Sequence, residues 1–271
     1  SHTASSDRPV FAWVHYVEPH APYRNWREYG EALGVDARNA PPADRYDTEI
    51  AYVDDAIGRL VERAGRLLHD PVIVFVSDHG ESLGEHDYWG HGRNLYEPTL
   101  RIPMAIAWGD RLSGGRVAGP ALITDIAPTV LGLIGGDAPD GFSGFDWTGV
   151  LTADAEPPTD RVTHYQAHRG AVMSRHESDL ARRSGVIEVG LIDGPIKETF
   201  RTQRQVRRVF DLSEDPGELH SRTAPKDNPS EALDGWMREV FTGLTSFDVD
   251  ATPEPLDEES AANLKSLGYI D

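Results

Sequence analysis

The strongest structural signal in this chain is the stretch Val72-Ile73-Val74-Phe75-Val76-Ser77-Asp78-His79-Gly80-Glu81. Its first five residues are apolar and mostly β-branched, which predicts a short buried strand. The run stops before Asp78 and His79, a carboxylate and an imidazole that are costly to bury unless something binds them. The stretch therefore predicts a buried strand whose end presents two potential metal ligands.

The residues before this strand predict an α/β fold. Residues 10–17 are mainly apolar and form a second strand candidate, and residues 44–68 form the clearest helix, with apolar positions recurring every three or four residues. The alternation of strand, helix and strand predicts a mainly parallel sheet flanked by helices. In such sheets ligands gather outside the carboxyl ends of the strands, which is where Asp78 and His79 lie.

The residues after about 160 predict a different architecture. Turn residues separate several short strand candidates, which predicts a smaller antiparallel sheet, followed by an amphipathic helix with Ser230 as its N-cap. The later candidates are strands at 102–108, 170–175, 186–192 and 206–212 and helices at 124–136 and 230–244. Residues 136–160 are rich in Gly, Pro and Asp and indicate a boundary. We therefore predict two domains, 1–158 and 159–271, the second a small α+β subdomain.

The composition excludes several classes of function. The formal net charge of the 271 residues is −19, and the densest basic group, Arg201, Arg204, Arg207 and Arg208, alternates with polar residues and is expected to be solvated, so we predict no nucleic-acid partner. No apolar run reaches 18 residues, so we predict no membrane span. Residues 1–7 lack the pattern of a signal peptide. The absence of Cys excludes disulfides, thiolate metal sites and a Cys nucleophile within these residues.

Three histidines besides His79 stand out along the chain. His91 follows His79 by twelve residues in a Gly-rich segment, and His20 lies between two prolines far upstream. His15 lies on the apolar strand candidate and is expected to be a core residue. Histidine suits contact with an anion or protonation of a leaving oxygen, because its charge state is tunable near neutral pH. We predict a metal-assisted hydrolase of an anionic ester.

An ordered set of motifs resembles the carboxyl-terminal half of the sulfatase family, within the alkaline-phosphatase-like superfamily. No single element is specific, but the set runs nearly from end to end. The matching stretches are His15–Tyr23, Tyr46–Gly58, Ser77–Glu81, Gly84–His86, Trp89–Gly92, Leu95–Glu97, Arg101–Pro103, Asp125–Thr129, Phe210–Glu218 and Leu264–Ile270. The resemblance implies an alkaline-phosphatase-like sheet flanked by helices, with 1–158 as the carboxyl-terminal half of the catalytic domain.

The resemblance also implies roles for particular residues. Asp78 and His79 would be two ligands of a divalent metal, usually calcium in sulfatases and often manganese or zinc in relatives that cleave phosphonates or phosphodiesters. His20 and His91 would be catalytic and would bind the substrate, together with Arg93. His91 stands where many sulfatases have Lys, which leaves sulfate, phosphodiester and phosphonate substrates open. His86 is a second-rank candidate, and Glu81 and Glu85 are expected to orient the histidines.

The family's nucleophile motif is missing from these residues. In sulfatases a Cys or Ser in a Cys/Ser-x-Pro-x-Arg segment matures to formylglycine, and two further metal-binding acids lie near the amino terminus; neither feature occurs here. The chain is therefore expected to be truncated and inactive alone.

The resemblance implies hydrolysis of sulfate esters such as sulfated sugars or aryl sulfates by the parent protein, in a periplasmic or extracellular setting. The alternatives are a phosphodiester or phosphonate ester hydrolase or a phosphoethanolamine-type transferase of the same superfamily, and a non-catalytic domain that binds a sulfated glycan or a protein.

Overall fold

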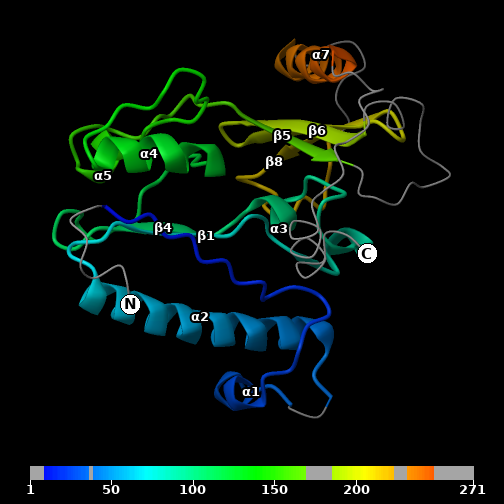
Figure 1. Cartoon of the computed structure of the whole chain (residues 1–271). Helices are drawn as coiled ribbons and strands as arrows, with labels where there is room; N and C mark the ends of the chain where they lie inside the picture. Colours follow the sequence, from blue (N-terminus) through cyan, green and yellow to red (C-terminus); the bar gives the residue numbers. More distant parts are fainter. Residues whose placement is uncertain (1–8, 37–38, 169–184, 223–230, 247–271) are drawn as a thin grey trace. The chain divides into compact units, whose positions relative to one another are not determined.

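The computed structural model describes residues 9–36, 39–168, 185–222 and 231–246 (Figure 1). The chain divides into two compact units. The first comprises the residues up to Val76 together with Met104–Gly115, and the second comprises Ser77–Pro103 and the residues from Arg116 onward. The predicted domains 1–158 and 159–271 stay a prediction.

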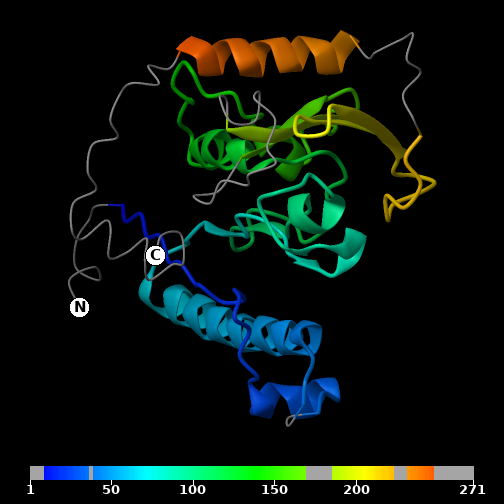
Figure 2. The ribbon, with the colours of Figure 1, turned by 90° about the vertical axis from the view of Figure 1, so that its right-hand side faces the viewer.

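Helix α2 (Pro42–Leu67) dominates the first unit and confirms the predicted helix. Proline at its first position suits a helix start, because its fixed φ is helical and its missing N–H would have no partner there. Helix α1 (Arg27–Leu33) packs beside α2 (Figure 2), with the ring of Trp26 stacked on Tyr52 at 3.9 Å. Gly34 ends α1 at φ 72°, a conformation that favours glycine.

Strands β1 (Ile73–Val76) and β4 (Met104–Ala107) confirm two of the predicted strands. They pair antiparallel, with Ile73 opposite Ala107. The segment 10–17 is not a strand, because it makes no strand pairing within the described part of the chain, and Phe11 and Trp13 are 87% and 81% exposed. His15 is exposed, so its assignment to the core was wrong.

A four-stranded sheet forms the centre of the second unit. It contains β5 (Thr163–His168), β6 (Val186–Asp193), β7 (Ile196–Arg201) and β8 (Val206–Asp211), all antiparallel and in the order β5-β6-β7-β8. The predicted small antiparallel sheet is confirmed. The candidate strand at 170–175 lies outside the described residues, and the sequence prediction missed β5 and β7.

Both faces of β6 are buried. Helix α7 (Glu231–Ser246), which confirms the last predicted helix, packs on one face, where Leu233 and Val240 meet Val186, Val189 and Leu191 (Figure 1). Ser230, the predicted N-cap, lies outside the described residues. On the other face Leu95 packs with Ala167 and Ile187. The segment that carries Leu95 is thereby fixed to the sheet, and it lies four residues after His91.

Short elements connect Ser77 to Pro103. Strands β2 (Ser82–Leu83) and β3 (Trp89–Gly90) pair antiparallel around the 3-10 turn Glu85–Asp87, and α3 (Glu97–Leu100) follows. Within the turn, His86 and Asp87 have φ of 55° and 56°, which non-glycine residues rarely adopt. The chain between the two strands is therefore tightly constrained.

A buried carboxylate organises the region around the predicted helix 124–136, which the structure shows as a 3-10 turn (Ile123–Asp125) followed by α4 (Ile126–Leu133). Asp125 accepts hydrogen bonds from the backbone of Leu122 and Phe145, the indole of Trp147 and the guanidinium of Arg161. Burial alone would raise the pKa of Asp125, but these hydrogen bonds, Arg161 first, hold it below its usual value. Helix α5 (Thr148–Leu151) begins directly after Trp147.

The basic group on β7 and β8 is not simply solvated. Arg201 lies 3.7 Å from the buried Glu188, Arg207 pairs with Asp234 of α7, and Arg208 donates to the hydroxyl of Tyr96, whereas Arg204 is exposed. The solvated-surface prediction was wrong for three of the four, because strand positions direct these side chains toward acceptors on neighbouring elements.

None of the described helices is both long and apolar enough to cross a bilayer.

Candidate active site

The turn that carries Asp78 and His79 follows directly on β1. The hydroxyl of Ser77 donates to the carbonyl of His79 at 2.7 Å, and the amide of His79 donates to the Asp78 carboxylate at 3.0 Å. These local bonds fix both backbone positions. The turn thus presents a carboxylate and an imidazole together, as the sequence predicted.

The hydrogen bonds of His79 decide which ring nitrogen can bind a cation. Its Nδ1 lies 2.8 Å from the carbonyl oxygen of Gly80, and a carbonyl only accepts, so Nδ1 carries the proton. The lone pair of the neutral ring is then on Nε2, which lies 3.6 Å from Oδ2 of Asp78. Both side chains reach solvent, so the oxygen and the nitrogen can approach one ion together.

His91 lies against His79 and is held by a buried carboxylate. The two imidazole rings stack with centroids 3.8 Å apart, and Nδ1 of His91 lies 3.4 Å from both carboxylate oxygens of Glu81. This contact raises the pKa of His91 although burial opposes the charge, and the charges of Glu81 and Asp78 act in the same direction. Glu81 therefore favours an imidazolium at His91, and the sequence expectation that Glu81 orients a histidine holds in the geometry.

The second-rank residues lie apart from this pair. His86 stacks on Tyr96 at 3.6 Å, with the rings nearly parallel. Arg93 is exposed and close enough to Tyr88 to oppose the rise in pKa that burial causes in that phenol. Tyr88 in turn donates to the carbonyl of His91 at 2.7 Å, which supports the backbone of the segment.

Glu85 has a different role from the one expected. Its carboxylate accepts from the backbone amide of Leu83 at 2.6 Å and lies 3.4 Å from the hydroxyl of Ser82. The side chain folds back on its own hairpin because these donors are two and three residues away. Glu85 shapes the turn between β2 and β3 instead of orienting a histidine.

His20 belongs to the first compact unit. Its Nδ1 lies 2.7 Å from the carbonyl of Ala21, which assigns the proton to Nδ1 as in His79. The buried carboxylate of Glu49 on α2 accepts from the amide of Arg24 at 2.7 Å and also receives a hydrogen bond from the backbone of His20. Burial raises the pKa of Glu49, and these amides oppose the rise.

The similarity to known proteins covers the same residues. The family profile described as Sulfatase matches residues 2–136, a range that contains His20, Asp78, His79, His91 and Arg93. The chain belongs to the sulfatase family. Choline-sulfatase of Rhizobium meliloti (strain 1021) is 28% identical to this sulfatase-family chain over 224 residues, covering 80% of the chain and 40% of the relative.

Solved structures confirm the alkaline-phosphatase-like fold. A protein in complex with its substrate D-glucosamine-2-N,6-O-disulfate superposes with a TM-score of 0.59 at 23% identity, covering 78% of this chain and 42% of that one. The phosphonate monoester hydrolase of Silicibacter pomeroyi superposes with a TM-score of 0.57 at 21% identity, covering 75% and 41%. The chain spans less than half the length of the relatives and structures named here.

Sequence reasoning overlooked Glu49 as a buried partner of the loop that carries His20. Glu49 lies four residues before the buried Val53, so an acidic side chain occupies the apolar stripe of α2. An acid on a buried helix face needs hydrogen-bond donors, and here these are the amides of the loop that carries His20. An acidic residue within the apolar stripe of α2 was therefore the sequence signal from which Glu49 could have been found.

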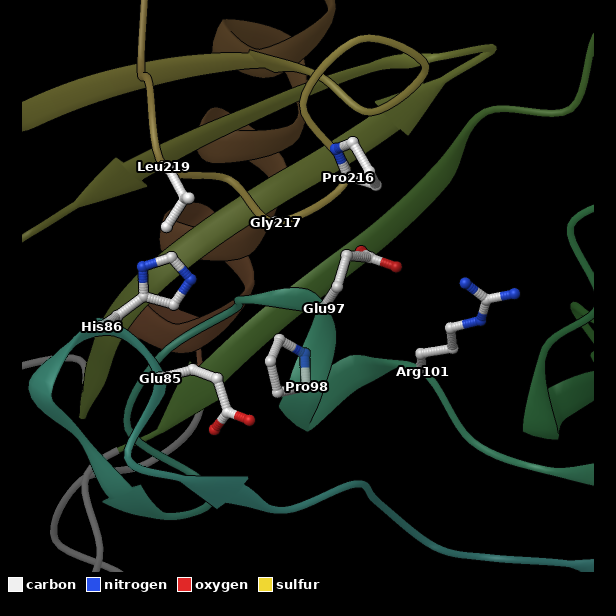
Figure 3. Close-up of a pocket in the computed structure, with 8 residues that line it drawn as sticks. All are labelled: Glu85, His86, Glu97, Pro98, Arg101, Pro216, Gly217 and Leu219. Carbon is white, nitrogen blue, oxygen red and sulfur yellow. The ribbon is translucent and has the colours of Figure 1, made fainter.

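A pocket of about 490 Å³ opens beside α3 (Figure 3). The turn between β2 and β3 contributes Glu85 and His86 to its walls. Helix α3 and the residue after it contribute Glu97, Pro98 and Arg101, and the segment after β8 contributes Pro216, Gly217 and Leu219. Asp78, His79 and His91 do not line it. Among the residues that the structure describes, no three His, Asp or Glu side chains gather closely enough to hold a metal ion.

Proposed function

We propose that this chain supplies metal-binding and anion-binding groups of a sulfuric ester hydrolase. One observation carries the proposal: a single compact unit places the Asp78 carboxylate, Nε2 of His79 and the His91 ring, whose pKa Glu81 raises, side by side. Membership of the sulfatase family supports it. His20 and Arg93 are the further groups assigned to contact the anionic ester.

The donor set fits a divalent cation. Asp78 Oδ2 and His79 Nε2 are 3.6 Å apart and reach solvent, so both can turn toward one ion. Carboxylate and imidazole are compatible with calcium, manganese or zinc, and calcium is the ion we propose. When bound, the ion supplies neutralisation of the charge on the ester's anionic group. Two protein ligands are too few for any of these ions, so we assign the others to parts of the protein outside these residues.

His91 is proposed to stabilise the anion as lysine does in many sulfatases. The buried Glu81 beside Nδ1 raises the pKa of His91, so the ring carries a positive charge over a wider pH range than a solvated histidine. A cation next to the transferred group lowers the energy of a transition state in which negative charge develops. The Glu81–His91 pair thus performs the task of a lysine.

The nucleophile is proposed to be a formylglycine outside these 271 residues. They contain no Cys and no Ser-x-Pro-x-Arg segment from which it could arise. We therefore expect the isolated chain not to turn over sulfate esters. Sulfated sugars and aryl sulfates are the proposed substrate class, since the relatives include a choline-sulfatase and a protein crystallised with a disulfated glucosamine.

A phosphonate monoester is the second candidate substrate. Histidine instead of lysine at residue 91 favours it, and the fold also matches a phosphonate monoester hydrolase. This candidate predicts manganese or zinc in place of calcium.

The test uses the complete gene product that contains this chain. Intact mass and tryptic mapping identify the nucleophile, metal analysis of the same sample identifies the ion, and turnover is compared for an aryl sulfate and an aryl phosphonate. We expect formylglycine, calcium and faster sulfate turnover that Asp78→Asn abolishes. An unmodified Ser or Thr with zinc or manganese would establish the second candidate. Metal binding without turnover of either ester would refute both.

A further inference from the structure

A lysine is fully buried in the four-stranded sheet. Lys197 of β7 is 1% exposed, and its ammonium lies 3.0 Å from Oε1 of Glu97 and 2.7 Å from Oε1 of Glu218. Buried lysines are rare because removing the charge from water is costly unless it is paired. One ammonium here links two carboxylates from segments that are far apart in the sequence. Such a linkage holds those segments together.

The cluster is tied to the backbone of α3. Oε2 of Glu218 accepts a hydrogen bond of 2.6 Å from the amide of Glu97, the first residue of that helix. Glu218 has φ 54°, and its own amide donates to the carbonyl of Asp215 at 3.0 Å, so a closed turn presents the carboxylate. Figure 3 shows Gly217 of this turn beside the pocket that α3 also lines. Lys197 and Glu218 therefore determine where α3 begins.

Helix α3 in turn supports the residue after His79. The amide of Gly80 donates to the carbonyl of Thr99 at 3.0 Å, and a Cβ at Gly80 would lie 2.1 Å from the carbonyl oxygen of Pro98. The two backbones are thus in direct contact. Since the carbonyl of Gly80 accepts from Nδ1 of His79, the position of α3 determines the position of the imidazole.

We propose that Lys197, together with Glu218, is a positioning residue for His79. The pair locates α3, α3 locates the Gly80 peptide, and that peptide sets the orientation and tautomer of the ring. The role in metal binding rests on the proposed function, whereas the mechanical link from Lys197 to Gly80 does not. The proposal thus gives the ion cluster around Lys197 of β7 a function in the site, although none of the candidate site residues belongs to that cluster.

The test is Lys197→Met in the complete gene product that contains this chain, with two readouts. Methionine keeps the volume but leaves the buried carboxylate of Glu218 and the partly buried carboxylate of Glu97 without their cation. We expect amide hydrogen exchange at Gly80 to become at least about tenfold faster and the dissociation constant for calcium to rise about 10- to 100-fold, the usual effect of losing a supporting partner. Glu218→Gln, which leaves one carboxylate for the one ammonium, is the second variant if the first does not fold, and a smaller change in the same direction is expected.

Val240→Ala is the matched control. It removes buried methyl groups on the α7 face of the sheet, away from α3. It is expected to destabilise the unit. The rate of amide hydrogen exchange at Gly80 through local opening, without global unfolding, is expected to stay unchanged. Unchanged exchange at Gly80 in both test variants would overturn the proposal, as would faster exchange with unchanged calcium affinity. If the unsubstituted gene product binds no calcium, the proposed metal site fails, and the exchange data still decide whether Lys197 positions the turn.

Discussion

Gly80→Ala is the sharpest test of the contact between α3 and the turn that carries Asp78 and His79. The new Cβ would lie 2.1 Å from the carbonyl oxygen of Pro98, where ordinary contact begins at 3.4 Å, so one backbone must move by more than 1 Å. Forcing an extra methyl into a packed site costs about 1–3 kcal/mol. Weakening the bond from Gly80 to Thr99 adds about 0.5–1.5 kcal/mol, and the lower entropy of the unfolded chain returns about 0.4–1 kcal/mol.

The expected loss in the free energy of unfolding is therefore about 1–3 kcal/mol. The displaced Gly80 peptide also carries the acceptor of His79, so we expect calcium affinity to fall about 10- to 100-fold. Urea unfolding of the chain measures the first effect, and calcium titration of the complete gene product with the same substitution measures the second. Gly65→Ala, in an open position within α2, is the control and should gain about 0.5–1 kcal/mol. A Gly80→Ala variant that unfolds and binds calcium as the parent does would refute the reasoning.

Three further substitutions probe other parts of the second unit. Asp125→Asn should cost about 3–5 kcal/mol in urea unfolding because Arg161 loses its buried partner. Folding lowers the pKa of Asp125, so the free energy of unfolding of the parent should fall as the pH drops through that pKa, and the variant should lack this dependence on pH. The same dependence on pH in both proteins would contradict the assignment. Glu81→Gln should lower the pKa of His91 in an NMR titration, and an unchanged value would show that Glu81 does not hold the proton. Leu233→Ala should cost about 2–5 kcal/mol, because Leu233 is fully buried, and a loss below about 1 kcal/mol would contradict the packing of α7.

Periodic apolar patterns predicted the elements that the structure confirms. The stripe of α2 and the β-branched run at β1 are local signals, and each gave the element within a few residues. Strand β7 was missed because Lys197, Glu198 and Thr199 do not read as an apolar strand. Lys197 is buried by an ion cluster formed with Glu97 and Glu218, and pairing between distant residues leaves no local pattern.

The same distinction applies to the candidate site. The motif around Asp78 and His79 could be recognised because the two residues are adjacent in sequence, and Glu81 lies on the same short turn. The stacking of His91 on His79 and the contact of α3 with Gly80 depend on how the chain returns from β3 to the sheet. The exposure of residues 10–17 could not be predicted either, since an apolar run does not specify which strand will pair with it.

The exposed rings of Phe11 and Trp13 have a consequence for how the chain behaves in solution. An extended apolar segment without strand partners among the described residues is a template for pairing with another copy. At low ionic strength the net charge of −19 keeps copies apart, but at 0.1 M salt charges more than about 10 Å apart are largely screened. We expect light scattering to show association that grows with sodium chloride, and Phe11→Ser with Trp13→Ser to suppress it. We therefore expect charge repulsion to keep copies of this chain apart in buffers of low salt.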